Sequence, residues 1–351
     1  MNVTFLIGNG FDVNLGLATR YTDFYPTYIK ANEHLPDDDC IKKFCMQIDG
    51  NYKNWSDFEY AFSQFATGTY TEIGKILADF DNRFAAHLKA ECEKCEYDFK
   101  IIAPILQKFL LYPYKYLPLA DEQKMHAFYK THERESTYFN FVSLNYTDTL
   151  DHLLGPEFKK GFPAGNIISN TKYNYYLQPI LHLHGSLAEG YTIVGIDSLD
   201  QFQDASLRTN PRVARHCVKQ SINTQNGFQT KEDQFANTIS TSNVICTYGI
   251  SFGETDRSRW VLLKDWLEAS SAHKLIIFKY NSGFPELDGI SKGPLLDAID
   301  ATRDEYLRLL GFEEDVFESM YDRIYVADSA GVLDFKLVED AASLAAATVV
   351  K

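Results

Sequence analysis

The chain has 351 residues, of which 45% are hydrophobic and 14% aromatic, and this composition is sufficient for a large buried core. Its formal net charge is -14 and it has no stripe of clustered Lys and Arg, which argues against binding to nucleic acid through a basic surface. No stretch is apolar for long enough to predict a transmembrane helix, and the first residues do not resemble a signal peptide. We therefore expect a cytoplasmic protein with no membrane partner.

Predicted strands alternate with predicted helices along the chain. Short apolar runs rich in β-branched residues, bounded by Gly, Asn or Asp, are typical of buried parallel strands. They cover residues 3–7, 139–144, 180–183, 192–196, 244–248, 275–278 and 324–326. Helical periodicity follows several of them, most clearly in Trp260, Leu263, Trp266 and Leu267. The alternation predicts an α/β fold with a Rossmann-like, doubly wound parallel sheet.

Residues 21–138 separate the first two predicted strands and show helical periodicity almost throughout. Phe58 and Phe62, for example, share one face of a helix. A connection between parallel strands needs far fewer residues than this stretch contains. We therefore predict a large helical insertion after the first βα unit, which divides the chain into a core of residues 1–20 and 139–351 and an insertion module of residues 21–138.

Residues 198–241 form a second predicted insertion. The stretch is polar, contains Asn210-Pro211 and Gly227, and favours helices over strands. A lid over the site is one role for it, which the sequence leaves open.

The six cysteines do not indicate a metal site. Cys92 and Cys95 have the C-x-x-C spacing, but no second pair is present to complete a four-thiolate zinc site. The same two residues continue a series that begins at Phe84 and Leu88, with the spacing of a buried stripe on one helix. We therefore expect core cysteines and no bound metal.

A glycine-rich turn follows the first predicted strand, at Gly8-Asn9-Gly10-Phe11-Asp12. Glycines here allow a tight turn and a close approach of a ligand to the backbone. The helix that follows would offer free N–H groups to a diphosphate. The third glycine of the dinucleotide-binding pattern is replaced by Val13. This turn alone therefore fits nucleotide binding and a tight turn without a ligand equally well.

Asn145 comes directly after the second predicted strand. In open α/β sheets, ligands lie beyond the carboxyl ends of the strands. A side-chain amide at this position can both donate to and accept from a ribose hydroxyl or a water molecule. The alternative is that Asn145 caps the helix that begins near Asp148.

His182 lies within the third predicted strand, near its end, and His184 directly follows that strand. The alternation of a strand predicts that both side chains lie on the same face. No convincing further ligands accompany them, so we do not expect a metal site. His184 lies at the edge of the sheet next to Gly185, where an imidazole is suited to act as a general base. A hydrogen-bonded core histidine is the alternative for each.

Further polar or small residues follow two later strands. Gly249 and Ser251 come after residues 244–248, and Asn281 follows residues 275–278. Since the carboxyl ends of parallel strands share one edge, these residues are expected to gather with Asn145 around one site.

Five short motifs occur together between the first strand and about residue 256. They are Gly8-Asn9-Gly10-Phe11-Asp12 with the following Gly16, Leu17, Thr19, Tyr21, Asp23 and Phe24; Trp55-Ser56-Asp57-Phe58-Glu59; Asn145-Tyr146-Thr147 within residues 141–150; His182-Leu183-His184-Gly185; and Tyr248-Gly249-Ile250-Ser251-Phe252-Gly253-Glu254-Thr255-Asp256. As a set, these motifs resemble the AbiH family of bacteriophage abortive infection proteins.

A more distant resemblance is to sirtuins and to sirtuin-like NAD⁺ hydrolases of phage defence. It rests on Gly8-x-Gly10, Gly16, Asn145, His184-Gly185, Gly249, Ser251 and Asn281. The sirtuin motif around the asparagine has Asp where this chain has Thr147, and the sirtuin zinc module is absent. The resemblance therefore implies an NAD⁺ site without protein deacylation.

The implied activity is that of an NAD⁺ glycohydrolase, which forms nicotinamide and ADP-ribose. Asn145 would position the ribose hydroxyls and the water, and His184 would accept a proton, while Gly8, Asn9, Gly10 and Ser251 would hold the diphosphate. The remaining residues implied in dinucleotide binding are Phe11, Asp12, Gly16, Thr147, Gly185, Gly249 and Asn281. The second hypothesis is a sensor or interaction module that binds NAD⁺ or an ADP-ribose derivative without turnover, which Thr147 favours. The sequence leaves the oligomeric state open, a homo-oligomer included.

Overall fold

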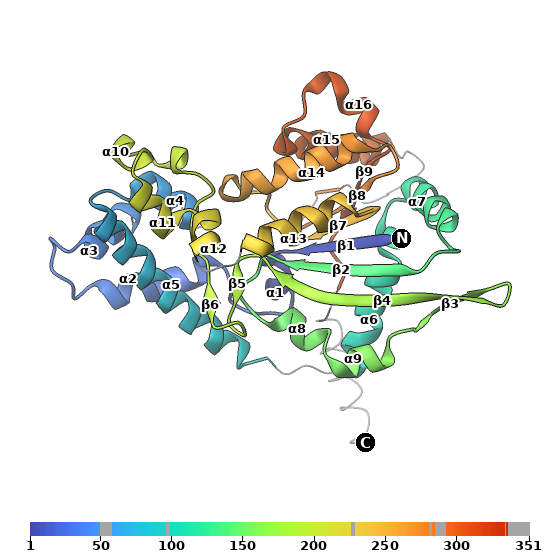
Figure 1. Ribbon diagram of the computed structural model, residues 1–351, viewed down its shortest axis with the longest axis horizontal. Helices are drawn as coiled ribbons and strands as arrows, with labels where there is room; N and C mark the ends of the chain where they lie inside the picture. Colours follow the sequence, from blue (N-terminus) through green and yellow to red (C-terminus); the bar gives the residue numbers. More distant parts are fainter. Residues whose placement is uncertain are drawn as a thin grey trace.

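The computed structural model describes residues 1–49, 58–95, 99–225, 229–280, 283–284, 293–333 and 335, and Figure 1 shows its elements. The strands are β1 (Asn2–Ile7), β2 (Thr137–Ser143), β3 (Gly165–Ile168), β4 (Thr171–His182), β5 (Gly185–Ser186), β6 (Tyr191–Thr192), β7 (Val244–Tyr248), β8 (Lys274–Lys279) and β9 (Ile324–Asp328). The α-helices ahead of β2 are α1 (Gly10–Asn14), α2 (Tyr21–Asn32), α3 (Cys40–Asp49), α4 (Phe58–Phe65), α5 (Tyr70–Cys92), α6 (Phe99–Leu111) and α7 (Leu119–Thr131). Those after β2 are α8 (Thr149–Leu153), α9 (Pro156–Gly161), α10 (Ala205–Arg208), α11 (Pro211–Cys217), α12 (Lys219–Gln225), α13 (Gln229–Ser240), α14 (Arg257–Ala269), α15 (Gly293–Leu310) and α16 (Phe317–Met320). Short 3₁₀ helices are η2 (Pro113–Tyr116), η3 (Leu199–Gln201), η4 (Glu254–Asp256) and η5 (Glu314–Val316).

Seven strands form one mostly parallel sheet, in the order β3-β4-β2-β1-β7-β8-β9. All neighbours are parallel except β3, which pairs with β4 in the antiparallel sense. When the six parallel strands are numbered in chain order, their order across the sheet is 3-2-1-4-5-6. The chain therefore builds one half of the sheet outward from β1 and the other half outward from β7, and these two strands are neighbours.

Six of the seven predicted strands lie in this sheet, so the α/β prediction is confirmed. The strand predicted at residues 192–196 is wrong, because only Thr192 of that range belongs to a strand, β6, which pairs with β5, while Ile196 forms an isolated bridge with Val218. The apolar side chains that suggested a strand, among them Val194 and Ile196, are instead buried against helices. A short apolar run does not reveal whether a sheet or a helix will cover it.

Both faces of the sheet are covered by helices, because side chains along each strand alternate between two cores. On β1, Phe5 faces a core that includes Leu106 of α6 and Phe158 of α9, whereas Leu6 faces a core with Trp260 of α14 and Leu307 of α15. Figure 1 shows α6, α8 and α9 below the sheet and α14 to α16 above it.

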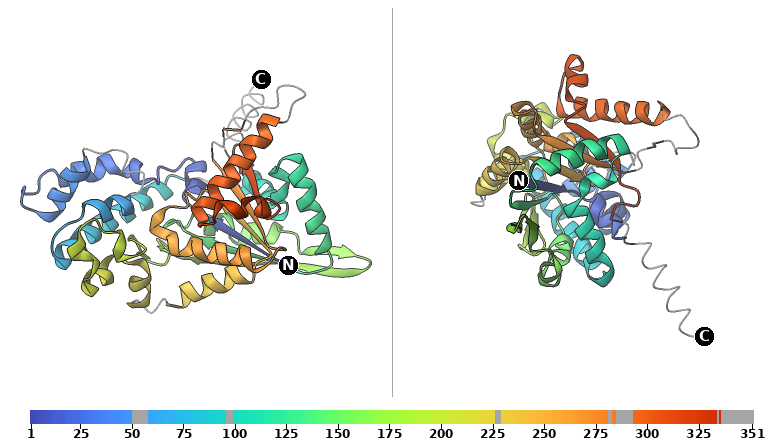
Figure 2. Two further views of the ribbon diagram at one scale, coloured as in Figure 1. Left: turned by 90° about the horizontal axis from the view of Figure 1, so that it is seen from above. Right: turned by 90° about the vertical axis from the view of Figure 1, so that its right-hand side faces the viewer.

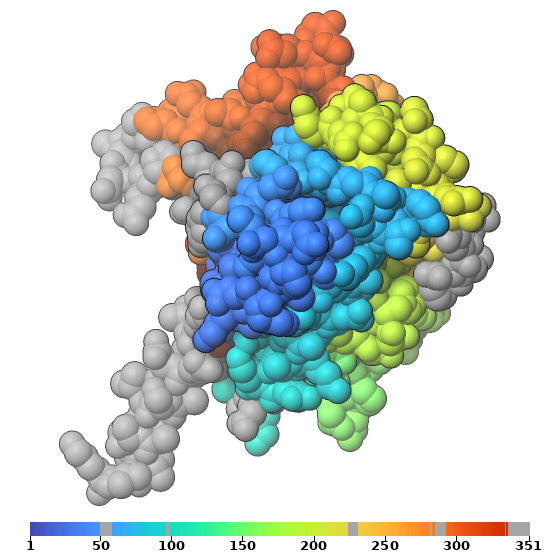
Figure 3. All heavy atoms as spheres, turned by 90° about the vertical axis from the view of Figure 1, so that its left-hand side faces the viewer, coloured from blue at the N-terminus to red at the C-terminus, as the bar shows by residue number. Residues whose placement is uncertain are grey.

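A third core lies beyond the carboxyl ends of the parallel strands. Helices α2 to α5 pack there with α10, α11 and the chain around Ile196. Figure 2 shows this helical group beside the sheet, and in Figure 3 the two chain segments that form it lie against each other. The helices α6 and α7 pack on the sheet instead, so residues 21–138 are shared between two cores. The division of the chain at residues 20 and 138 stays a prediction.

The predicted helical stripe of cysteines is only partly correct. Phe84 and Leu88 are buried on α5, but this helix ends at Cys92, so Cys95 does not continue the stripe, and both cysteines are partly exposed. Within the residues that the structure describes, no group of three or more His, Cys, Asp or Glu side chains is placed to hold a metal ion. Among the same residues, no helix is both long and apolar enough to cross a membrane.

The turn after β1 packs directly on the loop after β7. The Gly8 N–H donates to the Tyr248 carbonyl at 2.9 Å, and the Gly10 N–H donates to the Gly249 carbonyl at 3.1 Å. A Cβ at Gly10 would lie 2.5 Å from the Gly249 Cα, and Gly249 itself has a φ of 68°. These glycines are therefore required by the contact between the two loops.

Replacing Gly10 with alanine is expected to lower the free energy of unfolding by about 1–3 kcal/mol, the usual cost of overpacking. The Cβ would overlap backbone that has no room to move. Urea unfolding measures the effect. Gly161→Ala is the matched control, because a Cβ at this helical glycine meets nothing within 4 Å. Equal stability of the two variants would show that the loops are not packed in this way.

Candidate functional site

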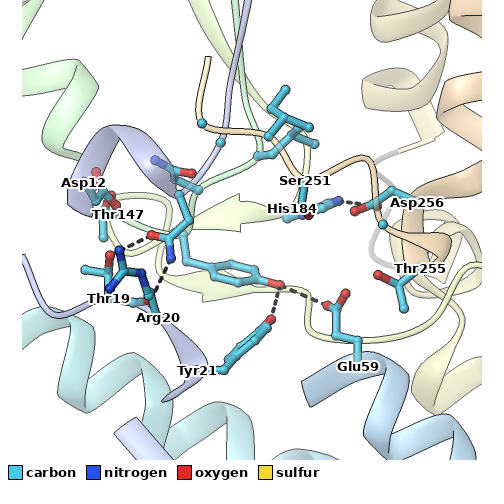
Figure 4. A pocket seen from close by; sticks show the side chains of 18 of the residues that line it. Asp12, Thr19, Arg20, Tyr21, Glu59, Thr147, His184, Ser251, Thr255 and Asp256 are labelled. Atoms are coloured by element: carbon cyan, nitrogen blue, oxygen red, sulfur yellow. Dashed lines mark hydrogen bonds and ion pairs between the residues drawn. The ribbon is translucent and has the colours of Figure 1, made fainter. Parts of the chain in front are cut away.

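A cavity of about 330 Å³ lies where the carboxyl ends of β1, β2 and β7 face the helices α2, α4 and α5 (Figure 4). Eight of the residues that the sequence assigned to catalysis or ligand binding line it: Gly8, Asn9, Asp12, Asn145, Thr147, His184, Gly249 and Ser251. They come from segments up to 243 positions apart (8 to 251). The structure thus brings the glycine turn, Asn145 and His184 to one cavity, as was expected from their positions after the strands.

Of the remaining predicted ligand-binding residues, Gly10, Phe11, Gly16 and Gly185 do not line this cavity. Phe11 is buried below it, edge-on to the ring of Tyr248. Gly16 forms a turn with a φ of 87°. Gly185 begins β5 with a φ of 73°, where a Cβ would lie 2.5 Å from the Tyr191 carbonyl oxygen. Phe11 thus packs in the core, and Gly16 and Gly185 allow backbone turns. Asn281 lies outside the described residues.

Three N–H groups of the glycine turn, which the sequence suggested for a diphosphate, are bonded within the protein. The N–H groups of Gly8 and Gly10 donate to the loop after β7, and that of Phe11 donates to the Gly8 carbonyl at 2.9 Å. The helix that follows, α1, has only five residues. These three donors are therefore not available to a ligand, because they are already used within the protein.

Asn9 positions a neighbouring loop. Its amide nitrogen donates to the Thr19 carbonyl at 3.1 Å, and its amide oxygen accepts from the Thr19 hydroxyl at 2.6 Å. On the other side of this loop, His87 of α5 lies 2.7 Å from the Ala18 carbonyl oxygen through Nε2. The loop that leads into α2 is thereby fixed from both sides.

Asp12 is a fully buried carboxyl at the edge of the cavity. It accepts hydrogen bonds from the hydroxyls of Thr147, at 2.6 Å, and Thr149. Burial raises the pKa of Asp12 to about 6, and the two threonine hydroxyls and the nearby Asn145 amide limit this rise. The sequence suggested Thr147 as a ligand-binding residue, but its hydroxyl donates a hydrogen bond within the protein, to Asp12.

Asp12 is expected to make stability depend on pH. Because its folded pKa of about 6 exceeds the ordinary 3.8, the folded state holds its proton more tightly, and stability falls as the pH rises through this window. The loss amounts to about 2 kcal/mol between pH 4 and pH 7, at 1.36 kcal/mol per pKa unit. Asp12→Asn should lack this part of the pH dependence in urea unfolding, while the exposed Asp233→Asn should keep it. The same slope in all three proteins would contradict the assignment.

Asn145 has a buried side-chain amide that interacts with the nearby Asp12 carboxyl. Only 4% of the residue is exposed, and neither its amide nitrogen nor its amide oxygen makes a hydrogen bond of normal geometry to a described residue. The alternative role as a helix cap is not seen, because α8 begins after Asp148. A buried amide whose hydrogen bonds are not satisfied is costly, so this group is suited to bind a polar ligand in the cavity it lines.

His184 is held by Asp256, which is the N-cap residue of α14. Its Nε2 lies 3.1 Å from a carboxylate oxygen of Asp256 (Figure 4). Burial and the charge of Lys219 lower the pKa of His184, although Asp256 opposes this, so the imidazole is neutral at pH 7. Since a carboxylate only accepts hydrogen bonds, Nε2 carries the proton and Nδ1 keeps a lone pair. A neutral, oriented imidazole of this kind is able to accept a proton.

His182 does not share the site, contrary to the alternation predicted for the two histidines. Its Nε2 lies 2.9 Å from a carboxylate oxygen of Asp151 on α8, and it does not line the cavity. The reason is that β4 ends at His182, so the period of two does not extend to His184.

A buried group of charges lies behind the histidine. Lys219 of α12 donates to Glu59 of α4 at 2.7 Å and to Asp256 at 3.0 Å, and Arg259 of α14 also contacts Asp256. Burial alone would raise the pKa of Asp256, but Lys219, His184 and Arg259 hold it well below its usual range. Asp256 is therefore a carboxylate, and Lys219 joins the helical group to the residues that hold the imidazole.

Sequence reasoning assigned no function to several residues that build this site. Arg20, Tyr21, Phe84 and Leu88 line the cavity from α2 and α5 or just before α2, and Tyr146 donates from its hydroxyl to Glu59 at 3.2 Å. Glu59 and Asp256 each lie in one of the five sequence motifs, and this position could have indicated a functional role. Lys219 carried none, because it is a single lysine in a polar stretch.

The comparisons with known proteins give one family. The family model described as "Bacteriophage abortive infection AbiH" matches residues 4–278, which is well over half of the chain and includes every described residue discussed at the cavity. No curated protein matches the chain.

Proposed function

Since the chain belongs to the AbiH family of bacteriophage abortive infection proteins, we propose that its cavity serves that role by binding NAD⁺ and hydrolysing it to nicotinamide and ADP-ribose. The observation that carries the proposal is the pairing of two groups in one cavity. Asn145 offers a buried amide that makes no hydrogen bond of normal geometry to a described residue, and His184 offers a neutral imidazole held by Asp256.

The fold supports a dinucleotide ligand. The strand order 3-2-1-4-5-6 is that of Rossmann-type dinucleotide-binding sheets, whose ligands lie where the chain order reverses. Here that position is between β1 and β7, and Gly8 and Gly249 line the cavity there. The cavity volume of about 330 Å³ is within the range of roughly 300–1,000 Å³ that is common for small-molecule sites.

The proposed reaction makes modest demands on the protein. The bond between ribose C1′ and the nicotinamide nitrogen breaks, and its electron pair leaves with nicotinamide, which becomes neutral. No general acid is therefore needed. A water oxygen bonds to C1′ while its proton passes to Nδ1 of His184. The Asn145 amide holds the ribose hydroxyls and the water in position, and Asp256 stabilises the imidazolium that forms.

The proposal is tested by incubating the purified full chain with NAD⁺ and separating the products by chromatography. We expect nicotinamide and ADP-ribose in equal amounts, and a much slower reaction with Asn145→Ala. Asn237→Ala is the control, because this asparagine lies on α13 away from the cavity. Release of nicotinamide at the same rate from the Asn145 variant would overturn the role of Asn145.

A second candidate function is binding without turnover, in which the cavity senses NAD⁺ or an ADP-ribose derivative. It is favoured by the hydroxyl of Thr147, which donates to Asp12 and is not free to contact a nicotinamide group. Calorimetry distinguishes the two functions. Saturable NAD⁺ binding with no nicotinamide released over hours would select the sensor.

A further inference from the structure

The charged groups around the cavity leave one cation without a protein partner among the described residues. Asp12, Glu59 and Asp256 are acidic lining residues, and Lys219 and Arg259 behind them form ion pairs with Glu59 and Asp256. Apart from the neutral His184, Arg20 is the basic side chain in the described lining, and it forms no ion pair with a described residue. An anionic ligand in this otherwise acidic cavity therefore has Arg20 as its counter-charge.

The backbone around Arg20 is fixed in advance. Thr19 exchanges two hydrogen bonds with Asn9, and the Ala18 N–H lies 3.3 Å from a carboxylate oxygen of Glu91, its acceptor on α5. The Arg20 N–H donates to Asp23 in the first turn of α2 at 3.0 Å. The side chain is exposed and leaves this anchored loop beside Tyr21, and Figure 4 shows it next to Thr19 at the cavity. An anchored backbone reduces the entropy that the arginine loses on binding.

We propose that Arg20 binds the diphosphate of the dinucleotide, in place of the glycine turn. This inference rests on the proposed function for the identity of the ligand. The N–H groups of Gly8, Gly10 and Phe11 are occupied within the protein, so these three backbone donors are not available to the diphosphate. The planar guanidinium donates two parallel hydrogen bonds to phosphate oxygens, which a lysine cannot do. Asn9 acts through Thr19 as a positioning residue.

The test compares two substrates with the same scissile bond, NAD⁺ and nicotinamide riboside, of which only the first has a diphosphate. Arg20→Ala is expected to raise the KM for NAD⁺ about 10-fold to 100-fold, the effect of hydrogen bonds to a charged group, and to leave nicotinamide riboside turnover unchanged. Arg20→Lys should give an intermediate KM. Lys30→Ala removes an exposed cation on the helix that follows Arg20, outside the cavity; it is the control and should leave both substrates unaffected. Equal effects of Arg20→Ala on both substrates, or no effect on either, would overturn the proposal.

A binding measurement keeps this inference separate from the hydrolysis itself. ADP-ribose carries the diphosphate but no nicotinamide bond, so its dissociation constant is measured by calorimetry whether or not the protein is an enzyme. We expect Arg20→Ala to weaken ADP-ribose binding tenfold or more and to reduce the dependence of binding on salt concentration. Identical ADP-ribose affinity in both proteins, or no binding to the unaltered chain, would overturn the role of Arg20. ADP-ribose binding that needs Arg20, with no NAD⁺ cleaved, would uphold it while the hydrolase proposal fails.

Discussion

Replacing His184 with alanine is expected to lower the rate constant for nicotinamide release by about 100-fold or more, the usual contribution of a general base. The imidazole is buried at the cavity, neutral, and held by Asp256 at 3.1 Å, so no other described side chain is equally placed to accept the proton. The KM for NAD⁺ should change little, because this proton transfer belongs to the transition state.

The control for this variant is His182→Ala, two residues away and equally buried but outside the cavity. It should release nicotinamide at the normal rate, provided that thermal unfolding shows it to be folded. The pH profile is a further readout. The rate of the unaltered protein should fall on the acid side only below the ordinary histidine pKa of 6.5, since the pKa of His184 is lowered. Full turnover by His184→Ala would remove His184 from the reaction.

Replacing Lys219 with methionine is expected to reduce the free energy of unfolding by about 3–5 kcal/mol, the typical loss when one partner of a buried ion pair is removed. Lys219 is 1% exposed and neutralises both Glu59 and Asp256, which would be left as buried carboxylates with less compensation. Although burial opposes its charge, Asp256 and Glu59 raise the pKa of Lys219. Urea unfolding at pH 7 measures the loss.

Two comparisons separate this effect from a general loss of packing. Lys75→Met removes an exposed pair with Asp39 and should cost less than about 1 kcal/mol. The double variant Lys219→Met/Glu59→Gln should be less destabilised than the sum of its two single variants, because the uncompensated charge is also removed. In addition, the acid limb of the pH profile of Lys219→Met should move to higher pH, since Lys219 lowers the pKa of His184. Additive losses in the double variant would show that the buried ion pair is not formed.

The location of the site was predictable from the sequence because it depends on strand ends. Apolar runs predicted β1, β2, β4 and β7, and the carboxyl ends of parallel strands share one edge of a sheet. Asn145, His184 and Gly249 follow such strands, so their presence in one cavity follows from the α/β pattern alone. Their chemical roles stay a proposal.

The parts that sequence reasoning did not predict depend on which surfaces meet. The N–H groups of Gly8 and Gly10 are occupied because the loop at Gly249 packs against them, and no pattern within the glycine turn reveals that neighbour. Glu59 and Lys219 are 160 positions apart and lie on helices whose sequences indicate only their buried faces. Their pairing is a result of tertiary packing, which periodicity does not encode.

The central claim is that the cavity between the sheet edge and the helical group holds a dinucleotide. A crystal structure of the full chain grown with saturating ADP-ribose tests it most directly. We predict that the distal ribose lies within hydrogen-bond distance of the Asn145 amide and beside His184, with the diphosphate at Arg20. Density for ADP-ribose at another surface, or an empty cavity in crystals whose protein binds the ligand in solution, would contradict the account.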